Sequence, residues 1–179
     1  MRIVGGKYRG RQFHPGKSFK SRPTTDFSKE SLFDILENRI SWEETSALDL
    51  FAGTGSISLE LISRGCKSVI AVEQDFVHCR FIRETAETLG IQNLAVIRDD
   101  AFHYLLRKKG PFDLIFADPP YTMNDFQSVA GKVLQSGLLK EGGLFILEHS
   151  KANRFEELPE FQELRKYGSV HFSFFKKEV

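Results

Sequence analysis

The chain has 179 residues, of which 41% are hydrophobic and 27% charged, enough for one globular domain with a real core. No apolar run approaches the ~20 residues of a membrane span, and residues 1–12 lack the apolar stretch of a secretory signal. We therefore expect a cytoplasmic protein with no membrane partner, whose two cysteines are reduced thiols.

The first 25 residues are strongly basic. They hold seven Lys or Arg residues and no acid, whereas the rest of the chain has 18 basic against 24 acidic residues, a balance of −6. A basic arm on an acidic body is common in proteins that bind nucleic acid, and a solvated tail is the simpler alternative. The pattern predicts a short β-hairpin over residues 2–13, then an amphipathic helix entered at Thr25 or Asp26. The expected apolar face of this helix is Phe27, Leu32, Phe33, Ile35, Leu36 and Ile40.

From residue 46 onward, short apolar runs alternate with helical patterns. The runs that resemble strands are 46–51, 68–73, 94–99, 112–118 and 142–149, and the helical patterns are 56–65, 76–90, 101–110 and 126–137. Strands buried on both faces of a sheet read as continuous apolar runs. The order therefore predicts a Rossmann-like, doubly wound α/β sheet that is mostly parallel. Two alternating runs that meet at Gly168 predict an antiparallel C-terminal hairpin.

A glycine loop follows the first predicted strand. Gly53 and Gly55 precede a helix, where a tight turn and the close approach of a ligand require residues without a Cβ. Glu73 ends the second strand twenty residues after Gly53, the offset at which an acid reaches ribose hydroxyls. Ser58 occupies the third glycine position of a dinucleotide fingerprint. Asp49 would repel a pyrophosphate but suits an ammonium or sulfonium group, and S-adenosylmethionine carries both.

Two more acids follow the third strand. Asp100, which precedes Ala101, is placed to accept a hydrogen bond from the adenine amino group, and Asp99 has the alternative role of a helix cap. Asp49 has an alternative too, as a strand-end acid satisfied by backbone amides.

The stretch Asp118-Pro119-Pro120-Tyr121 follows the fourth strand, at the same sheet edge as the glycine loop. Two consecutive prolines continue neither a helix nor an interior strand, so they form a rigid corner. The exocyclic amine of a base is a poor nucleophile because its lone pair is delocalised into the ring. Asp118 and the Pro119 carbonyl would accept its two N–H groups and aim the lone pair at a methyl donor, with Tyr121 stacked on the base. The alternative is a plain loop with a proline stop.

These motifs together carry a family resemblance. The ordered set "DLFAGTGSISLE", "AVEQD", "DDA" and "DPPY" resembles class I S-adenosylmethionine-dependent methyltransferases that modify exocyclic amines. The segments "RIVGGKYRGRQ" and "RPTTDFSKESLFDIL" resemble, more narrowly, the RsmD-type 16S rRNA (guanine-N2)-methyltransferases. Phe27 and Lys29 stand where arginines are common, which bears on the RNA contacts of that helix. The resemblance implies a monomer that methylates guanine N2 in 16S ribosomal RNA, either naked or in an assembled small subunit with ribosomal protein.

The resemblance also implies a set of site residues. The S-adenosylmethionine contacts are expected at Asp49, Phe51, Gly53, Thr54, Gly55, Glu73, Gln74, Asp100, Ala101 and Asp118, and the catalytic corner at Asp118, Pro119, Pro120 and Tyr121. The RNA contacts are expected at Arg2, Lys7, Arg9, Arg11, Arg22 and Thr24. Residues 1–40 would form an RNA-contacting extension and residues 41–179 the methyltransferase domain, in one compact unit. No metal is expected, because no two histidines have ligand spacing.

Two alternatives stay open. Asp118 would also accept hydrogen bonds from the N6 amine of adenine in DNA or RNA, although the chain has no segment long enough for a DNA-recognition module. A dinucleotide-dependent oxidoreductase, or a nucleotide-binding module without catalysis, is the alternative of another class. Neither has a use for Asp49 or for the proline corner.

Overall fold

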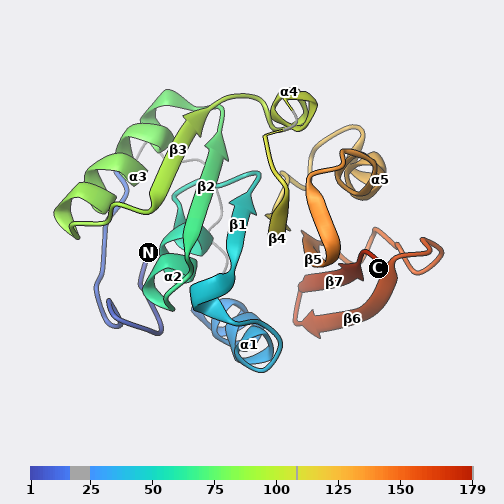
Figure 1. Ribbon diagram of the computed structural model, residues 1–179, viewed down its shortest axis with the longest axis horizontal. Coiled ribbons are helices and arrows are strands. Elements are labelled where there is room, and N and C mark those ends of the chain that lie inside the picture. The colour runs from blue at the N-terminus through green and yellow to red at the C-terminus, as the bar shows by residue number, and fades with distance from the viewer. Residues whose placement is uncertain (17–24, 108, 179) are drawn as a thin grey trace.

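The computed structural model describes residues 1–16, 25–107 and 109–178 (Figure 1). The strands are β1 (Ser46–Asp49), β2 (Ser68–Glu73), β3 (Leu94–Arg98), β4 (Phe112–Ala117), β5 (Leu139–His149), β6 (Phe161–Tyr167) and β7 (Val170–Lys176). They form one sheet in the order β3-β2-β1-β4-β5-β7-β6. Neighbours from β3 to β5 are parallel, and β7 is antiparallel to both β5 and β6. The mostly parallel sheet with an antiparallel C-terminal hairpin is therefore confirmed.

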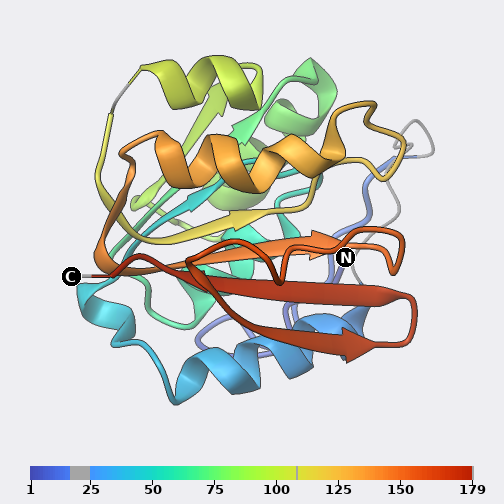
Figure 2. The ribbon, with the colours of Figure 1, turned by 90° about the vertical axis from the view of Figure 1, so that its right-hand side faces the viewer.

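Helices cover both faces of this sheet. They are α1 (Asp26–Glu37), α2 (Ser56–Ser63), α3 (Phe76–Thr88), α4 (Ala101–Leu106) and α5 (Val129–Gln135), with short 3-10 turns η1 (Trp42–Glu44) and η2 (Phe126–Ser128). Figure 2 shows α5 on one side of the sheet and α1 on the other. The four predicted helical patterns after residue 46 all contain a helix, shorter than the pattern in each case because the ends are turns.

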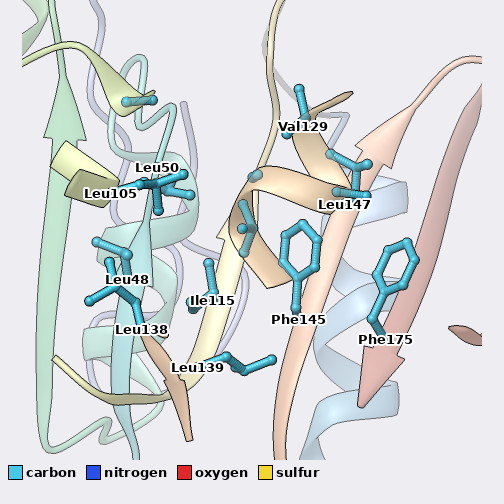
Figure 3. Close-up of a cluster of buried hydrophobic side chains, with 14 of the residues drawn as sticks. Leu48, Leu50, Leu105, Ile115, Val129, Leu138, Leu139, Phe145, Leu147 and Phe175 are labelled. Carbon is cyan, nitrogen blue, oxygen red and sulfur yellow. The ribbon is translucent and has the colours of Figure 1, made fainter. Parts of the chain in front are cut away.

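Alternate residues of the central strands face opposite sides, so the sheet has two hydrophobic cores. Leu48, Ile115 and Phe145 face α4 and α5, and Figure 3 shows them in one buried cluster. Leu114 and Ile146 face the other way, into the core that α1 and α2 cover. All five side chains are buried, and each fully buried side chain of this size contributes about 1.5–3 kcal/mol.

Helix α1 begins where the sequence predicts. Thr25 is its N-cap, and the Thr25 hydroxyl oxygen accepts the backbone N–H of Ser28 at 3.2 Å. Leu32 is buried in the core as expected, but Phe27 is 68% exposed, so its assignment to the apolar face was wrong. Five residues at 100° each place Phe27 about 140° around the helix from Leu32. Its ring instead meets Tyr167 edge-on, with centroids 6.0 Å apart.

The predicted N-terminal hairpin is present but too short to form strands. An antiparallel bridge joins Arg2 and Gln12, and the N–H groups of Ile3 and Phe13 donate across the hairpin to the Arg11 and Met1 carbonyls at 3.0 and 2.9 Å. The segment also docks on α2. The Lys7 N–H donates to the Ser63 carbonyl at 2.7 Å. Gly6 has φ +71°, and a Cβ there would lie 1.9 Å from the same carbonyl oxygen. Only glycine allows the segment to dock so closely.

A buried ion pair fastens this N-terminal segment to the body. Glu60 of α2 is fully buried, and its Oε2 accepts the Val4 N–H at 2.8 Å and lies 3.7 Å from the Lys29 Nζ. The Lys29 ammonium donates to the Arg2 carbonyl and to the Ser56 hydroxyl. Burial lowers the pKa of Lys29, and Glu60 opposes that shift. Lys29 therefore supports the fold and has no surface to offer RNA.

We predict that Glu60→Ala destabilises the protein by about 3–5 kcal/mol, because it leaves the buried Lys29 charge without its counter-ion and the Val4 N–H without its acceptor. Unfolding in urea measures the loss. Glu37→Ala is the matched control. Glu60 and Glu37 both pair with Arg64, but Glu37 is more than half exposed, so its loss should change stability little. Equal losses in the two variants would contradict a special role for the buried pair.

Candidate functional site

The glycine loop between β1 and α2 has the backbone that the sequence predicts. Gly53 and Gly55 have φ of 54° and 77°, and Gly55 is the N-cap residue of α2. A Cβ on Gly55 would lie 2.8 Å from Cγ1 of Ile82. The side chain of Thr54, between the two glycines, is buried. The loop is thus a tight turn in which a side chain would clash at Gly55 and would strain the backbone at both glycines.

Glu73 holds this loop against the start of α3. Its Oε2 accepts the Gly53 N–H and its Oε1 the Asp75 N–H, both at 2.8 Å. Asp75, which our reading of the sequence missed, caps α3 by accepting the N–H groups of Val77 and His78; the signal was an Asp directly before a helical pattern. Gln74, between the two acids, is exposed. The ribose contact of Glu73 stays a prediction, and the structure adds a role in shaping the loop.

Asp49, the last residue of β1, is buried and only half satisfied. The Ser58 hydroxyl donates to Asp49 Oδ2 at 2.7 Å. The other carboxyl oxygen, Oδ1, is buried and accepts no hydrogen bond within the part of the chain that the structure describes. Burial raises the pKa of Asp49 from 3.8 to about 7. A buried acceptor without a partner fits a site for a cationic ligand group better than a strand-end acid satisfied by backbone amides.

The acid that caps the helix after β3 is Asp100, and not Asp99. Asp100 is the N-cap of α4, and its Oδ1 accepts the His103 N–H at 2.9 Å. Asp99, expected as the cap, instead contacts the His103 ring at 2.8 Å and pairs with Arg107 at 2.7 Å. Which of two adjacent acids caps a helix depends on its first residue, here Ala101, and sequence patterns rarely fix that residue. Asp100 remains a proposed adenine contact, with one oxygen engaged in the cap.

Two further residues expected at the ligand lie beside this cap. Ala101 is buried as the first residue of α4. Phe51, in the glycine loop, is partly buried and its ring packs edge-on against Phe102 at 6.1 Å between centroids. The loop after β1 and the start of α4 are therefore in direct contact, as a single ligand spanning both would require.

The proline corner follows β4 directly. Pro119 is buried, and the Pro120 carbonyl accepts the Met123 N–H at 2.9 Å, which closes the turn. The Tyr121 ring is 45% exposed and contacts Phe126 edge-on at 6.3 Å between centroids. Burial, then the charges of Glu148 and Asp49, raise the pKa of Asp118 well above its usual value. The corner thus presents a carboxyl group that holds its proton more tightly than usual, beside a half-exposed aromatic ring.

Glu148, near the end of β5, belongs to the same cluster and was missed in the sequence. It is 4% exposed, and the Tyr121 hydroxyl donates to its Oε1 at 3.4 Å. Its signal was an acid inside an otherwise apolar strand. Within the described residues, no group of three acidic, histidine or cysteine side chains is arranged to hold a metal ion.

The residues expected to contact RNA differ in their exposure, and two of them lie outside the described residues. Lys7, Arg9 and Arg11 are exposed. Arg2 is about half exposed and pairs with Asp26 at 3.0 Å. Arg22 and Thr24 lie outside the described residues.

Both ring nitrogens of His149 have partners within the fold. The side chain is buried, one ring nitrogen contacts the Ser173 hydroxyl at 2.7 Å, and the other contacts the Ser150 carbonyl at 2.8 Å. Burial lowers the pKa of His149, which favours the neutral ring. Within the described residues, no helix has the length and apolar character needed to cross a membrane.

The elements that end at this edge resemble known proteins along nearly the whole chain. The family model described as Conserved hypothetical protein 95 matches residues 1–176. The YlbH protein of Bacillus subtilis (strain 168), named as a candidate rRNA methyltransferase, is 31% identical over 99% of both chains. Ribosomal RNA small subunit methyltransferase D of Escherichia coli (strain K12) is 29% identical over 100% of this chain and 91% of its own. The solved structure of the candidate methyltransferase yhhF from Escherichia coli has a TM-score of 0.88 and 26% identity, and covers 100% of this chain and 98% of that one.

A glycine loop after β1, acids at the ends of β1 and β2, and a proline corner after β4 define a class I S-adenosylmethionine-dependent methyltransferase. The chain belongs to the Conserved hypothetical protein 95 family, the RsmD-type methyltransferases.

We predict that Asp49→Asn removes part of the pH dependence of folding. With a native pKa of about 7 against 3.8, the stability that Asp49 contributes is fully present below the lower value and is lost as pH rises through the upper one. The Asn side chain does not ionise, so the variant does not lose stability in this way. The gain of the variant over the parent should therefore grow by about 2–3 kcal/mol between pH 5 and pH 8.

Urea unfolding at the two pH values gives this difference directly. Asp34→Asn, on the exposed face of α1, is the control. Its difference in stability from the parent should be the same at both pH values. A pH-independent difference for Asp49→Asn would show that Asp49 is ionised throughout.

Proposed function

We propose that the protein transfers a methyl group from S-adenosylmethionine to the exocyclic N2 amine of a guanine in small-subunit ribosomal RNA, in the cytoplasm and as a monomer. The observation that carries this proposal is the Asp118-Pro119-Pro120-Tyr121 corner beside a buried Asp49 with an unpartnered oxygen. The names of the relatives support rRNA as the substrate class. The choice of the N2 amine rests on the family resemblance and on the acceptors at the corner.

The cofactor would be held by residues of four adjacent strand ends. Asp49 Oδ1 offers an acceptor for the ammonium group, and Glu73 one for the ribose hydroxyls. The bare backbone at Gly53 and Gly55 lets the ligand approach the loop, and Asp100 faces the adenine amino group. Bound S-adenosylmethionine supplies a methyl group activated by its sulfonium, and the sulfur keeps the electron pair of the broken carbon–sulfur bond.

The corner would make the amine nucleophilic. Asp118 and the Pro119 carbonyl accept the two N–H groups, which draws the nitrogen out of conjugation and points its lone pair at the methyl carbon. As the new carbon–nitrogen bond forms, the nitrogen loses one proton to the Asp118 carboxylate and from there to solvent. Burial beside Glu148 and Asp49 raises the pKa of Asp118, which makes its ionised form a better proton acceptor. Tyr121 stacks on the base and holds its plane.

The N-terminal segment would bring the RNA. We propose residues 1–40 as the RNA-contacting part and residues 41–179 as the methyltransferase domain. Lys7, Arg9 and Arg11 are exposed on a segment that α2 and Lys29 hold in place. Because the charges sit on a docked backbone, less conformational entropy is lost when they meet phosphates than for a free tail.

The test is incubation with labelled S-adenosylmethionine and small ribosomal subunits that lack the modification, alongside naked 16S RNA and DNA. Label on a guanine N2 of the small-subunit RNA supports the proposal, and the comparison shows whether the assembled particle is needed. Label on adenine N6 would favour the alternative enzyme instead. Absence of label from every nucleic acid would overturn the proposal.

We predict that Asp118→Ala abolishes methyl transfer and leaves the affinity for S-adenosylhomocysteine within a few-fold. Loss of one positioned acceptor should raise the barrier by ~2.7–4 kcal/mol, by analogy with oxyanion-hole donors. The fold should not suffer, because the change removes like-charge repulsion from a buried cluster. Single-turnover rates and calorimetric titration measure the two effects, with Asp34→Ala as the exposed control; near-parental turnover would make the corner purely structural.

We further predict a salt signature for the N-terminal arm. If Arg2, Lys7, Arg9, Arg11 and Arg22 each neutralise a phosphate of a single-stranded target, log affinity should fall with log salt at a slope of about −3.5, from ~0.7 per contact. Replacing all five by Gln should flatten the slope and leave S-adenosylhomocysteine binding intact. Replacing Arg80 and Arg83 of α3 serves as the control. An unchanged slope with a lower melting temperature would identify the arm as structural.

A further inference from the structure

A second acid lies beside Asp118 on the neighbouring strand. The β4–β5 register pairs Ala117 with Leu147, so the next residues along the two strands, Asp118 and Glu148, are neighbours. Ile146 faces the core under α1 and α2, and strand alternation puts Glu148 on the same face. The Tyr121 hydroxyl donates to Glu148 Oε1 at 3.4 Å. Glu148 is therefore part of the corner that receives the base.

The fold keeps this acid at an energetic cost. Glu148 is 4% exposed, and the charges of both Glu148 and Asp49 raise the pKa of Asp118. Neighbouring buried carboxylates repel one another, and nothing in the methyl transfer as derived above requires a second one. A ligand that supplies two adjacent hydrogen-bond donors would relieve that repulsion, because a donor placed against each carboxylate offsets part of its negative charge.

The Watson–Crick edge of guanine has this arrangement, since N1–H and the N2 amine are adjacent donors. Adenine instead has an unprotonated, accepting N1 beside its N6 amine, and a carboxylate facing that nitrogen would be repelled. We propose that Glu148 determines the specificity for guanine: its carboxylate accepts N1–H while Asp118 accepts an N–H of the neighbouring N2 amine. This inference rests on the proposed function and deepens it, because it assigns the choice between guanine and adenine to one residue.

Tyr121 would couple recognition to stacking. Its hydroxyl holds one oxygen of Glu148, and its ring, edge-on to Phe126, is held at the entrance of the corner. The carboxylate that reads N1–H is thereby oriented by the ring that covers the base. A positioned polar group of this kind discriminates strongly, because the wrong base leaves it buried and unpaired.

The test uses RNA with either guanine or 2-aminopurine at the target position. Both have the 2-amino group, but N1 of 2-aminopurine carries no hydrogen. The parent enzyme should prefer guanine by on the order of tenfold to a hundredfold in kcat/KM, the discrimination of one good base contact. Glu148→Gln should be slower on guanine and should bring the ratio close to one, because its amide can donate to the bare N1. Binding of the two RNAs to protein loaded with S-adenosylhomocysteine should change in the same direction.

Glu141→Gln is the matched control, an exposed acid on the same strand, and should keep the parental ratio. A parental ratio in Glu148→Gln, or equal rates of the parent enzyme on the two bases, would overturn the inference. The rates of the parent enzyme on the two bases are measured without any variant. Equal rates would therefore contradict the inference even if Glu148→Gln failed to fold. If the parent enzyme places no methyl group on guanine N2 at all, the proposed function has failed, and the inference falls with it.

Discussion

Parallel pairing brings acids from neighbouring strands to one edge of this sheet, and the site depends on that constraint. Asp49 ends β1, Asp118 follows β4 and Glu148 lies near the end of β5, and the register of the three strands holds them on one face. Within the part of the chain that the structure describes, one buried oxygen of Asp49 accepts no hydrogen bond. The three acids repel one another. The apolar cores on both sides of the sheet supply the stability that offsets this repulsion.

The N-terminal segment is held by hydrogen bonds to α2, the helix that follows the glycine loop. Lys29 contacts both the Arg2 carbonyl and the hydroxyl of Ser56, the first residue of α2 after the glycine loop. Glu60, one turn further along α2, binds the Val4 N–H. A segment that carries exposed cations is thus fastened directly to the helix that begins at the ligand loop. RNA bound to the arm would therefore lie at a fixed distance from the cofactor loop.

Sequence patterns predicted the features that depend on local chemistry. The run 68–73 coincides with β2, and the capping threonine, the glycine loop and the proline corner were placed correctly because each has a local physical signature. The errors concern features decided by distant partners or by the phase of a helix. Phe27 points away from the core, and the docking of the N-terminal hairpin on α2 had no local signature. The role of Glu148 depends on the β4–β5 register, which only the assembled sheet defines.

The position of β7 has a consequence for how the chain is assembled. β7 follows β6 in sequence but lies between β5 and β6 in the sheet. During synthesis β6 therefore emerges before the strand with which it pairs, and the edge of β5 stays open until β7 arrives. Such open edges invite pairing with other chains. Charged side chains on β6, including Glu163, Arg165 and Lys166, make it a poor partner for a foreign strand while it waits. In the finished fold, Glu163 forms ion pairs with Arg39 and Arg165. The charges that protect the nascent chain are therefore paired once the sheet is complete.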